Sequence, residues 1–339
     1  MPRFSTARAK LQQHRALVCA LLALLVVVAA LCSLGLGSTG AGLGDLGALL
    51  RGQTTGNAGI ILYVRLPRTL GALLTGVAMA VSGVIIQGVL ANPLAGPNLI
   101  GVNAGAGLAA ILCSALLPAL SAAVPVAAFG GALAASLLVF LMARKTGASR
   151  ITLVLAGVAI SGILGALIDA VATVNPDALV GANTFMVGGL SGVMLTTLIL
   201  PGILIAAAAL AAWSLSYELD LLSLGDEVAA SLGLPVRVYR FALLAIAAAL
   251  AGSAVSFAGL IGFVGLIVPH AARFLVGEEN RGLIPAAALL GALLVVVCDL
   301  LARLLFAPYE LPVGIVLSLL GGPFFLWLLI RQRGGRLRD

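Results

Sequence analysis

The sequence predicts an all-α protein that crosses a lipid bilayer about ten times. The prediction rests on the composition, on ten long apolar stretches and on the placement of the basic residues. Of the 339 residues, 62% are hydrophobic and only 9% are charged, whereas a soluble domain usually carries about 25% charged residues. A soluble fold of this length could not bury so much apolar surface, so we expect lipid to solvate much of the chain.

Each predicted helix is an apolar stretch long enough to span a bilayer, which takes about 20 residues. The ten stretches are residues 16–36, 64–90, 96–117, 122–143, 151–173, 192–213, 236–257, 260–277, 283–305 and 312–331. The first is longer than the apolar core of a cleaved signal peptide, so we expect it to be retained as a membrane helix. The stretch at 260–277 fits least well, because Pro269 and glycines interrupt it.

The basic residues support an even number of spans. If both termini are cytoplasmic, only Arg51, Arg65, Arg68 and Arg303 of the 19 Lys and Arg residues remain outside, as the positive-inside rule requires. The rest form short clusters between apolar runs, not one basic face, so we expect no nucleic-acid partner. The sequence therefore predicts one multi-pass domain over residues 1–339 in the cell membrane, with lipid as a partner.

A hydrophilic connection at about residues 217–235 lies between the sixth and seventh spans. Acidic Asp226 and Glu227 follow Gly225 and favour a helix start, because they lie near the positive end of the helix dipole. Gly233 and Pro235 are typical of a helix end. A solvated connector and a partner-docking helix both fit this pattern.

Polar residues within the spans are costly and often functional. Asp299 and Arg303 are four residues apart and are predicted to pair on one helix face. Asp169 lies late in the fifth stretch, either facing a pathway or reaching the interface. The pair Asn92–Pro93 predicts an interhelical turn, and His270, after Pro269, is more typical of a structural histidine than of a ligand.

Several motifs in order along the chain resemble the FecCD-type permeases of ABC importers. They are Arg65-Leu66-Pro67-Arg68 with Ser82-Gly83, Gln87, Asn92-Pro93-Leu94-Ala95, Pro97 and Gly101; Gly225 to Pro235; Gly262 to His270 with Arg273 and Gly277; and Asp299, Arg303, Glu310 to Gly314 and Gly321-Gly322-Pro323. Together they cover about residues 60–331.

The resemblance implies a ten-helix subunit with the type II-like ABC importer permease fold, in a homodimer or close heterodimer. Two ATPase subunits would bind from the cytoplasm and a substrate-binding protein from outside. The implied ATPase-coupling residues are Gly225, Asp226, Glu227, Ala229, Ala230, Leu232 and Gly233. The implied docking cations are Arg65, Arg68 and Arg303, and the implied intramembrane polar or hinge residues are Gln87, Asn92, Pro93, Asp169, Pro269, His270 and Asp299. From the cargo of this family, the resemblance implies a ferric siderophore as the first expected substrate, followed by haem or cobalamin.

The sequence contains no GxxxxGK[ST] phosphate loop. If import is driven by ATP, the nucleotide and Mg²⁺ are expected to bind partner subunits, and this chain is expected to hold no cofactor or metal and to catalyse no reaction.

Two other functions stay open at this point. Gly189-Leu190-Ser191-Gly192 fits the GxSG form of rhomboid proteases, with His270 as a candidate base. A nucleophile needs its base within hydrogen-bond reach, and nothing in the sequence places His270 there. An ion-coupled secondary transporter would need ionisable groups at mid-membrane, for which only Asp169 and Asp299 qualify.

Overall fold

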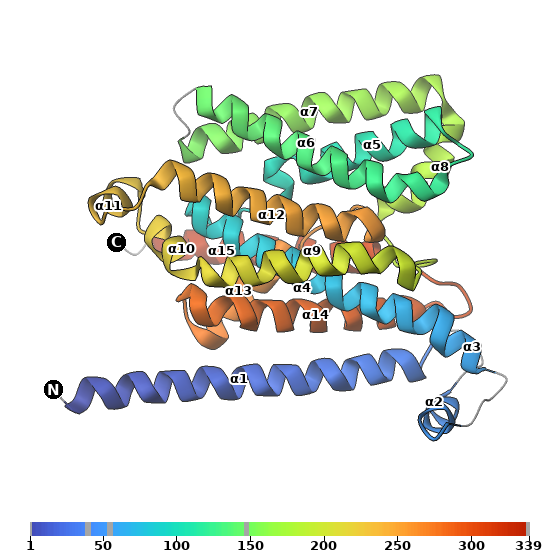
Figure 1. Ribbon diagram of the computed structural model, residues 1–339, viewed down its shortest axis with the longest axis horizontal. Helices are drawn as coiled ribbons and strands as arrows, with labels where there is room; N and C mark the ends of the chain where they lie inside the picture. Colours follow the sequence, from blue (N-terminus) through green and yellow to red (C-terminus); the bar gives the residue numbers. More distant parts are fainter. Residues whose placement is uncertain (1, 38–41, 53–56, 146–148, 337–339) are drawn as a thin grey trace.

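The computed structural model describes residues 2–37, 42–52, 57–145 and 149–336, and these residues form a bundle of helices (Figure 1). The helices of the first half are α1 (Pro2–Gly35), α2 (Leu43–Leu50), α3 (Ala58–Ile60), a π-helical turn (Ile61–Arg65), α4 (Leu66–Leu90), α5 (Val102–Leu116) and α6 (Val124–Lys145). They are followed by α7 (Arg150–Val174), α8 (Pro176–Val187), α9 (Leu195–Ser214), α10 (Ser216–Ser223), α11 (Asp226–Ser231), α12 (Val236–Ala258), α13 (Val264–Val276), α14 (Asn280–Leu304) and α15 (Val313–Arg336). Short 3-10 turns at Pro97–Ile100 and Ser121–Ala123 precede α5 and α6.

All ten predicted stretches are helical in the described part of the chain, which confirms the predicted fold class. Among the described residues, seven helices are long and apolar enough to cross a bilayer, and three shorter apolar helices, Val102–Leu116, Val264–Val276 and Val313–Leu328, account for the other stretches. The sequence did not predict α2, α8 or α10, because each is too short to show a membrane-length apolar run.

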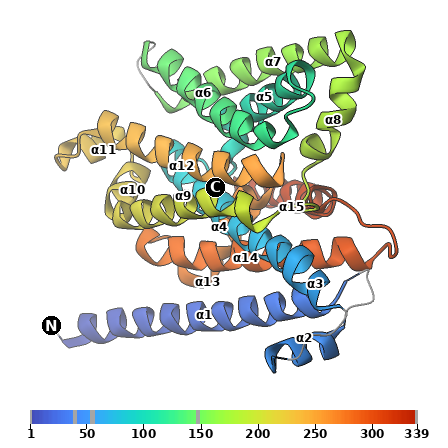
Figure 2. The same cartoon turned by 45° about the vertical axis from the view of Figure 1, so that its right-hand side comes forward.

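The bundle has two ends that differ in their contents. α1 begins and α15 finishes at the end where α10 and α11 lie, and α2, α3 and α8 lie at the opposite end (Figure 1). We refer to these as the α11 end and the α8 end. Turning the molecule shows α5, α6 and α7 grouped on one side and α1, α13 and α14 on the other, with α4, α9 and α12 between them (Figure 2).

α4 is the enclosed centre of this arrangement. In the span Ala58–Leu90, which ends with α4, 78% of the residues in the most apolar stretch are buried, whereas the share is 11% in α1 and in α7. Glycines make this close packing possible: a Cβ atom on Gly76 would overlap the backbone of Gly291 in α14, and one on Gly83 would overlap Gly265 in α13. Small residues at such crossings let helix backbones approach, as their frequency in the sequence indicates.

The weakest predicted span, 260–277, is a short helix preceded by an irregular segment. α13 begins only at Val264, after Phe263 with a left-handed φ of 65°. The backbone N–H of Leu260 donates to the carbonyl of Phe185 in α8, at 2.8 Å, and that of Gly189 donates to Ala258, at 2.9 Å. The end of α8 thus supplies hydrogen-bond partners to the non-helical backbone, which hydrocarbon could not do.

Candidate functional site

The predicted hydrophilic connection folds as two short helices at the α11 end. α11 begins at Asp226 after Gly225, whose φ of 119° suits only glycine, and the predicted helix at this position is confirmed. It finishes in a glycine turn: Leu234 N–H donates to Ala229 and Gly233 N–H donates to Ala230, both at 3.0 Å. Gly233 has a φ of 85°, which explains a glycine at this place.

One face of this connection is apolar and uncovered. Leu224, Val228 and Leu232 are 62%, 46% and 60% exposed, although Ala229 between them is fully buried. Among the predicted coupling residues, Glu227, Ala230 and Gly233 are also exposed. Ala229 therefore seats α11 on the bundle, and its neighbours form a surface available to another protein.

Ion pairs fix α11 to two membrane helices. The Asp226 carboxylate pairs with Arg240 of α12, whose side chain is 3% exposed, and lies 3.4 Å from Nη2 of Arg150 in α7. The same Arg150 nitrogen donates to the carbonyl of Leu222 in α10, at 2.6 Å. Movement of α11 would therefore be transmitted directly to α7 and α12.

α10 is fixed to the start of α14. Asp220 Oδ1 accepts hydrogen bonds from the backbone N–H of Asn280, at 3.0 Å, and from its side-chain amide, at 2.7 Å. Burial raises the pKa of Asp220 above its usual value, and these hydrogen bonds from Asn280 oppose the rise.

A cavity of about 590 Å³ opens at the α11 end beside these helices. It is lined by Gln87, Gly88, Ala91, Asn92, Pro93, Ser223, Leu224, His270, Arg273, Phe274, Glu278 and Asn280. The structure thus brings four of the predicted intramembrane polar or hinge residues, Gln87, Asn92, Pro93 and His270, into one cavity wall.

Gln87 connects α4, in which it lies, to α13. It accepts a hydrogen bond from Arg273 and donates from Nε2 to the carbonyl of Gly265, at 3.3 Å. Asn92 forms the predicted turn, because its Oδ1 accepts from Leu94 N–H at 2.9 Å. His270 packs edge-on to Phe274, with ring centroids 5.0 Å apart, and Pro269 is buried within α13.

A network of charges lies at the α8 end, and the predicted Asp299–Arg303 pair forms part of it, with a separation of 3.2 Å. Arg68 Nε donates to both Asp299 oxygens, at 2.9 and 3.1 Å, and Arg68 also pairs with Glu310. Asp299 is therefore held between two arginines from different helices, and its carboxylate is fully buried.

Two arginines also bind the carbonyls at the end of α1. Arg65 Nη1 donates to Leu34 at 2.9 Å, and Arg303 Nη1 donates to Ser33 and Leu36 at 3.2 Å. Cations at this position complement the negative end of a helix dipole. The arginines therefore attach the end of α1 to the π-helical turn that precedes α4 and to α14.

Arg65, Arg68 and Arg303, the implied docking cations, are buried in this structure. They are 3%, 5% and 2% exposed. Their carboxylate and carbonyl partners replace the hydrogen bonds of the guanidinium groups to water and so offset the desolvation cost of this burial. Their role in docking stays a prediction. Among the described residues of this network, Glu310 is the one whose side chain reaches the surface, with 31% exposure.

Asp169 does not join either group of polar residues. It is exposed on α7, and its backbone carbonyl accepts a hydrogen bond from Thr173. Among the described residues, no three His, Cys, Asp or Glu side chains lie close enough to hold a metal ion.

The protease alternative does not fit the positions of its two residues. Ser191 is exposed just before α9, which begins at the α8 end, and His270 lines the cavity at the α11 end (Figure 1). The secondary-transporter alternative also loses its candidates, because Asp299 is held by two arginines and Asp169 stands apart on α7.

Sequence reasoning missed Arg150, Arg240 and Asn280 as partners of the acidic connection. Arg240 follows Asp226 by only 14 residues, so the short turn after α11 could have predicted that the two residues lie close together. Arg150 and Asn280 come from distant parts of the chain, and no local pattern indicates their contacts.

Residues 24–331 match the FecCD transport family. The chain belongs to this family. The resemblance stated from the motifs is thereby confirmed, and the chain is a multi-pass membrane permease of the FecCD type.

Similar proteins support this assignment over nearly the full length. The permease is 41% identical over 333 residues to the hemin transport system permease protein HmuU of Yersinia pestis, covering 96% of this chain and 98% of the relative. It is 40% identical over 286 residues to the Fe(3+) dicitrate transport system permease protein FecD of Escherichia coli K12, covering 81% and 86%. A solved inward-facing structure of the metal-chelate ABC transporter type has a TM-score of 0.79 at 30% identity and covers 93% of this FecCD permease and 99% of that chain.

Proposed function

We propose that this permease forms the membrane pathway of an ATP-driven importer for ferric chelates, with ferric siderophores as the leading cargo. The observation that carries the proposal is the surface of α11, which is uncovered at its apolar residues and fixed by ion pairs to α7 and α12. A separate ATPase subunit bound there would move membrane helices directly. Two copies of the permease, or this chain and a close relative, would enclose the pathway between them.

The α11 end is the cytoplasmic end in this proposal. It would place both termini and most basic residues inside the cell, as the positive-inside rule requires. ATP and Mg²⁺ would bind the ATPase subunits, and this chain would act by rigid-body movement between inward- and outward-open states. The membrane is the cytoplasmic membrane, known as the inner membrane in cells that have two.

A substrate-binding protein would dock at the α8 end. Because Arg68 is already paired with Asp299 and Glu310, docking through this network would require a carboxylate of the binding protein to replace Glu310. Arginine suits such an exchange, since it pairs with two carboxylates at once and keeps its charge.

Haem is the second candidate cargo. The observation that favours it is the relative named for hemin transport, which is 41% identical and covers 96% of this chain. The ferric dicitrate permease of Escherichia coli and a probable siderophore transport permease of Bacillus subtilis support the leading candidate, and each is 40% identical over 81% of this chain. Cobalamin is supported only by the resemblance to the FecCD-type permeases.

Uptake into vesicles tests the proposal. The permease, its ATPase and its binding protein are reconstituted together, and uptake of a labelled ferric siderophore and of haem is measured with and without ATP. We expect ATP-dependent uptake of one chelate class that a collapsed ion gradient does not reduce. Uptake that continues without ATP and follows the ion gradient would contradict the proposal.

A further inference from the structure

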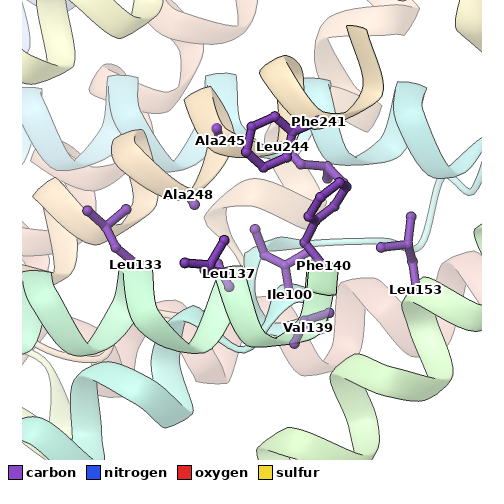
Figure 3. A pocket seen from close by; sticks show the side chains of 11 residues that line it. Ile100, Leu133, Leu137, Val139, Phe140, Leu153, Phe241, Leu244, Ala245 and Ala248 are labelled. Carbon is purple, nitrogen blue, oxygen red and sulfur yellow. The ribbon is translucent and has the colours of Figure 1, made fainter. Parts of the chain in front are cut away.

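Two neighbouring hollows in the described part of the chain form one continuous cleft between α6 and α12. The deeper hollow has a volume of about 210 Å³ and is lined almost entirely by apolar side chains (Figure 3). The outer hollow has a volume of about 380 Å³ and lies toward the α11 end. Leu137, Phe140 and Phe241 line both hollows, so a single elongated molecule can occupy the two.

The cleft is apolar inside and basic at its mouth. Leu133 and Leu137 of α6 lie opposite Leu244, Ala245 and Ala248 of α12 in the deeper part (Figure 3).

Three arginines line the outer hollow: Arg144 at the end of α6, and Arg237 and Arg240 in the first turns of α12. Arg144 and Arg237 are exposed, and neither has an ion-pair partner within the described ranges. The mouth therefore has two cations available for an anion.

The surroundings of the cleft are those of a lipid-facing surface. Leu137, Leu141, Val238 and Phe241 are 49%, 40%, 63% and 42% exposed beside it, which is tolerated where hydrocarbon replaces water. A basic pocket between membrane helices, at the end of the bundle where basic residues gather, is a site for anionic lipid headgroups. Arginine also matches the geometry of a phosphate group.

We propose that the α6–α12 cleft binds one anionic phospholipid, with an acyl chain along Leu133, Leu137 and Ala245 and its phosphate at Arg144 and Arg237. The aromatic rings of Phe140 and Phe241, whose centroids are 4.5 Å apart, lie between the chain and headgroup portions. Because Arg240 at the same mouth is the ion-pair partner of Asp226, the lipid occupies a position next to the attachment of α11. The site does not depend on which cargo the permease carries.

The test measures lipid retention on the full chain in its assembled transporter. The complex is partly delipidated in detergent, phosphatidylglycerol or phosphatidylcholine is added, and bound lipid is counted by native mass spectrometry. We expect the wild type to retain phosphatidylglycerol preferentially and R144Q/R237Q to lose about 10- to 30-fold in affinity for it, with little change for phosphatidylcholine. A245F, which fills the apolar part, should weaken retention of both lipids.

R281Q is the matched control, because Arg281 is an exposed arginine at the same end that lines a different hollow. The proposal is overturned if the wild type retains both lipids equally, or if R281Q loses as much affinity as R144Q/R237Q. It is also overturned if glycerol phosphate, which has no acyl chain, displaces the lipid, because the ligand is then a soluble anion. A change of oligomeric mass in A245F without a change in lipid retention would identify the cleft as an interface between copies, again against the proposal.

Photolabelling provides a measurement on the unmodified protein, in case the variants fail to fold. Phosphatidylglycerol with a photoreactive group in its acyl chain is expected to label peptides covering residues 133–144 and 237–248. Labelling confined to other helices would contradict the site.

Discussion

Asp226 and Arg240 form an ion pair that joins the first residue of α11 to the second turn of α12. The two residues differ in environment, because the Asp226 side chain is 43% exposed and that of Arg240 is 3% exposed. A force on the uncovered helix α11 therefore reaches a guanidinium group that is enclosed by the bundle. Arg150 extends the same contact to α7, so that one carboxylate joins three helices.

Replacing Asp226 by Asn should weaken this connection. The enclosed Arg240 loses its charged partner, which costs about 1–3 kcal/mol where a hydrogen bond to a charged group is lost. We expect a lower thermal unfolding midpoint and less transport per ATP hydrolysed, measured in reconstituted vesicles. Asp177→Asn, at an exposed position in α8, is the control and should change neither quantity; an unchanged transport ratio in Asp226→Asn would argue against transmission through this pair.

Replacing Asp299 by Asn should destabilise the α8 end. Arg68 and Arg303 would then lie close together without the buried carboxylate between them, and breaking a buried pair in this way costs about 3–5 kcal/mol. The measurement is the unfolding midpoint in detergent together with the yield of folded protein. Asp169→Asn, at an exposed position on α7, should have a free energy of unfolding within about 0.5 kcal/mol of that of the wild type. An equal loss of stability in both variants would contradict the structural role of Asp299.

Gly76→Ala should disturb the crossing of α4 and α14. The added Cβ would overlap the backbone of Gly291, and overpacking costs about 1–3 kcal/mol or more when backbone has to move. Gly162→Ala provides a matched control, because nothing lies within 4 Å of a Cβ there and the residue is inside a helix. We expect Gly162→Ala to be neutral or stabilising by up to about 1 kcal/mol; equal unfolding midpoints for the two variants would show that the crossing is looser than described.

Asp220 predicts a pH dependence. Burial raises its pKa in the folded state above the unfolded value of 3.8, so the folded state holds the proton more tightly. The unfolded state binds fewer protons in this range, and the contribution of Asp220 to stability falls as pH rises through the raised pKa. Asp220→Asn keeps an oxygen for Asn280 and removes the charge, so its unfolding midpoint should equal or exceed that of the wild type at pH 7. The difference should shrink as pH falls toward 4, and a growing advantage of the variant at low pH would contradict this sign.

The apolar stretches were predictable because a bilayer requires long runs of apolar residues, and in the described part of the chain seven of them are helices of membrane-spanning length and three are shorter. Helix α11 was predictable from Gly225, Asp226 and Gly233, whose roles at helix ends depend only on neighbouring residues. The Asp299–Arg303 pair was predictable for the same reason, since four residues separate partners on one helix face.

The surroundings of the arginines were not predictable from local sequence. The burial of Arg68 depends on Asp299, which is 231 residues away, and that of Arg65 depends on the end of α1. A basic residue near a span end has the same local pattern whether it contacts water, lipid or a distant carboxylate. Only the packing of α1, α4 and α14 decides among these environments.

The enclosure of α4 has a consequence for how the chain assembles during synthesis. Its neighbours α12, α13 and α14 are made more than 140 residues after it, so the newly inserted helix meets lipid first and protein later. During that interval the side chains of Ser82 and Gln87 lack the hydrogen-bond partners in α12 and α13 that they have in the finished bundle. A ribosome-bound chain that stops before Val236 would therefore present α4 as a target for membrane chaperones and quality-control proteases, and completion of α14 would end that exposure.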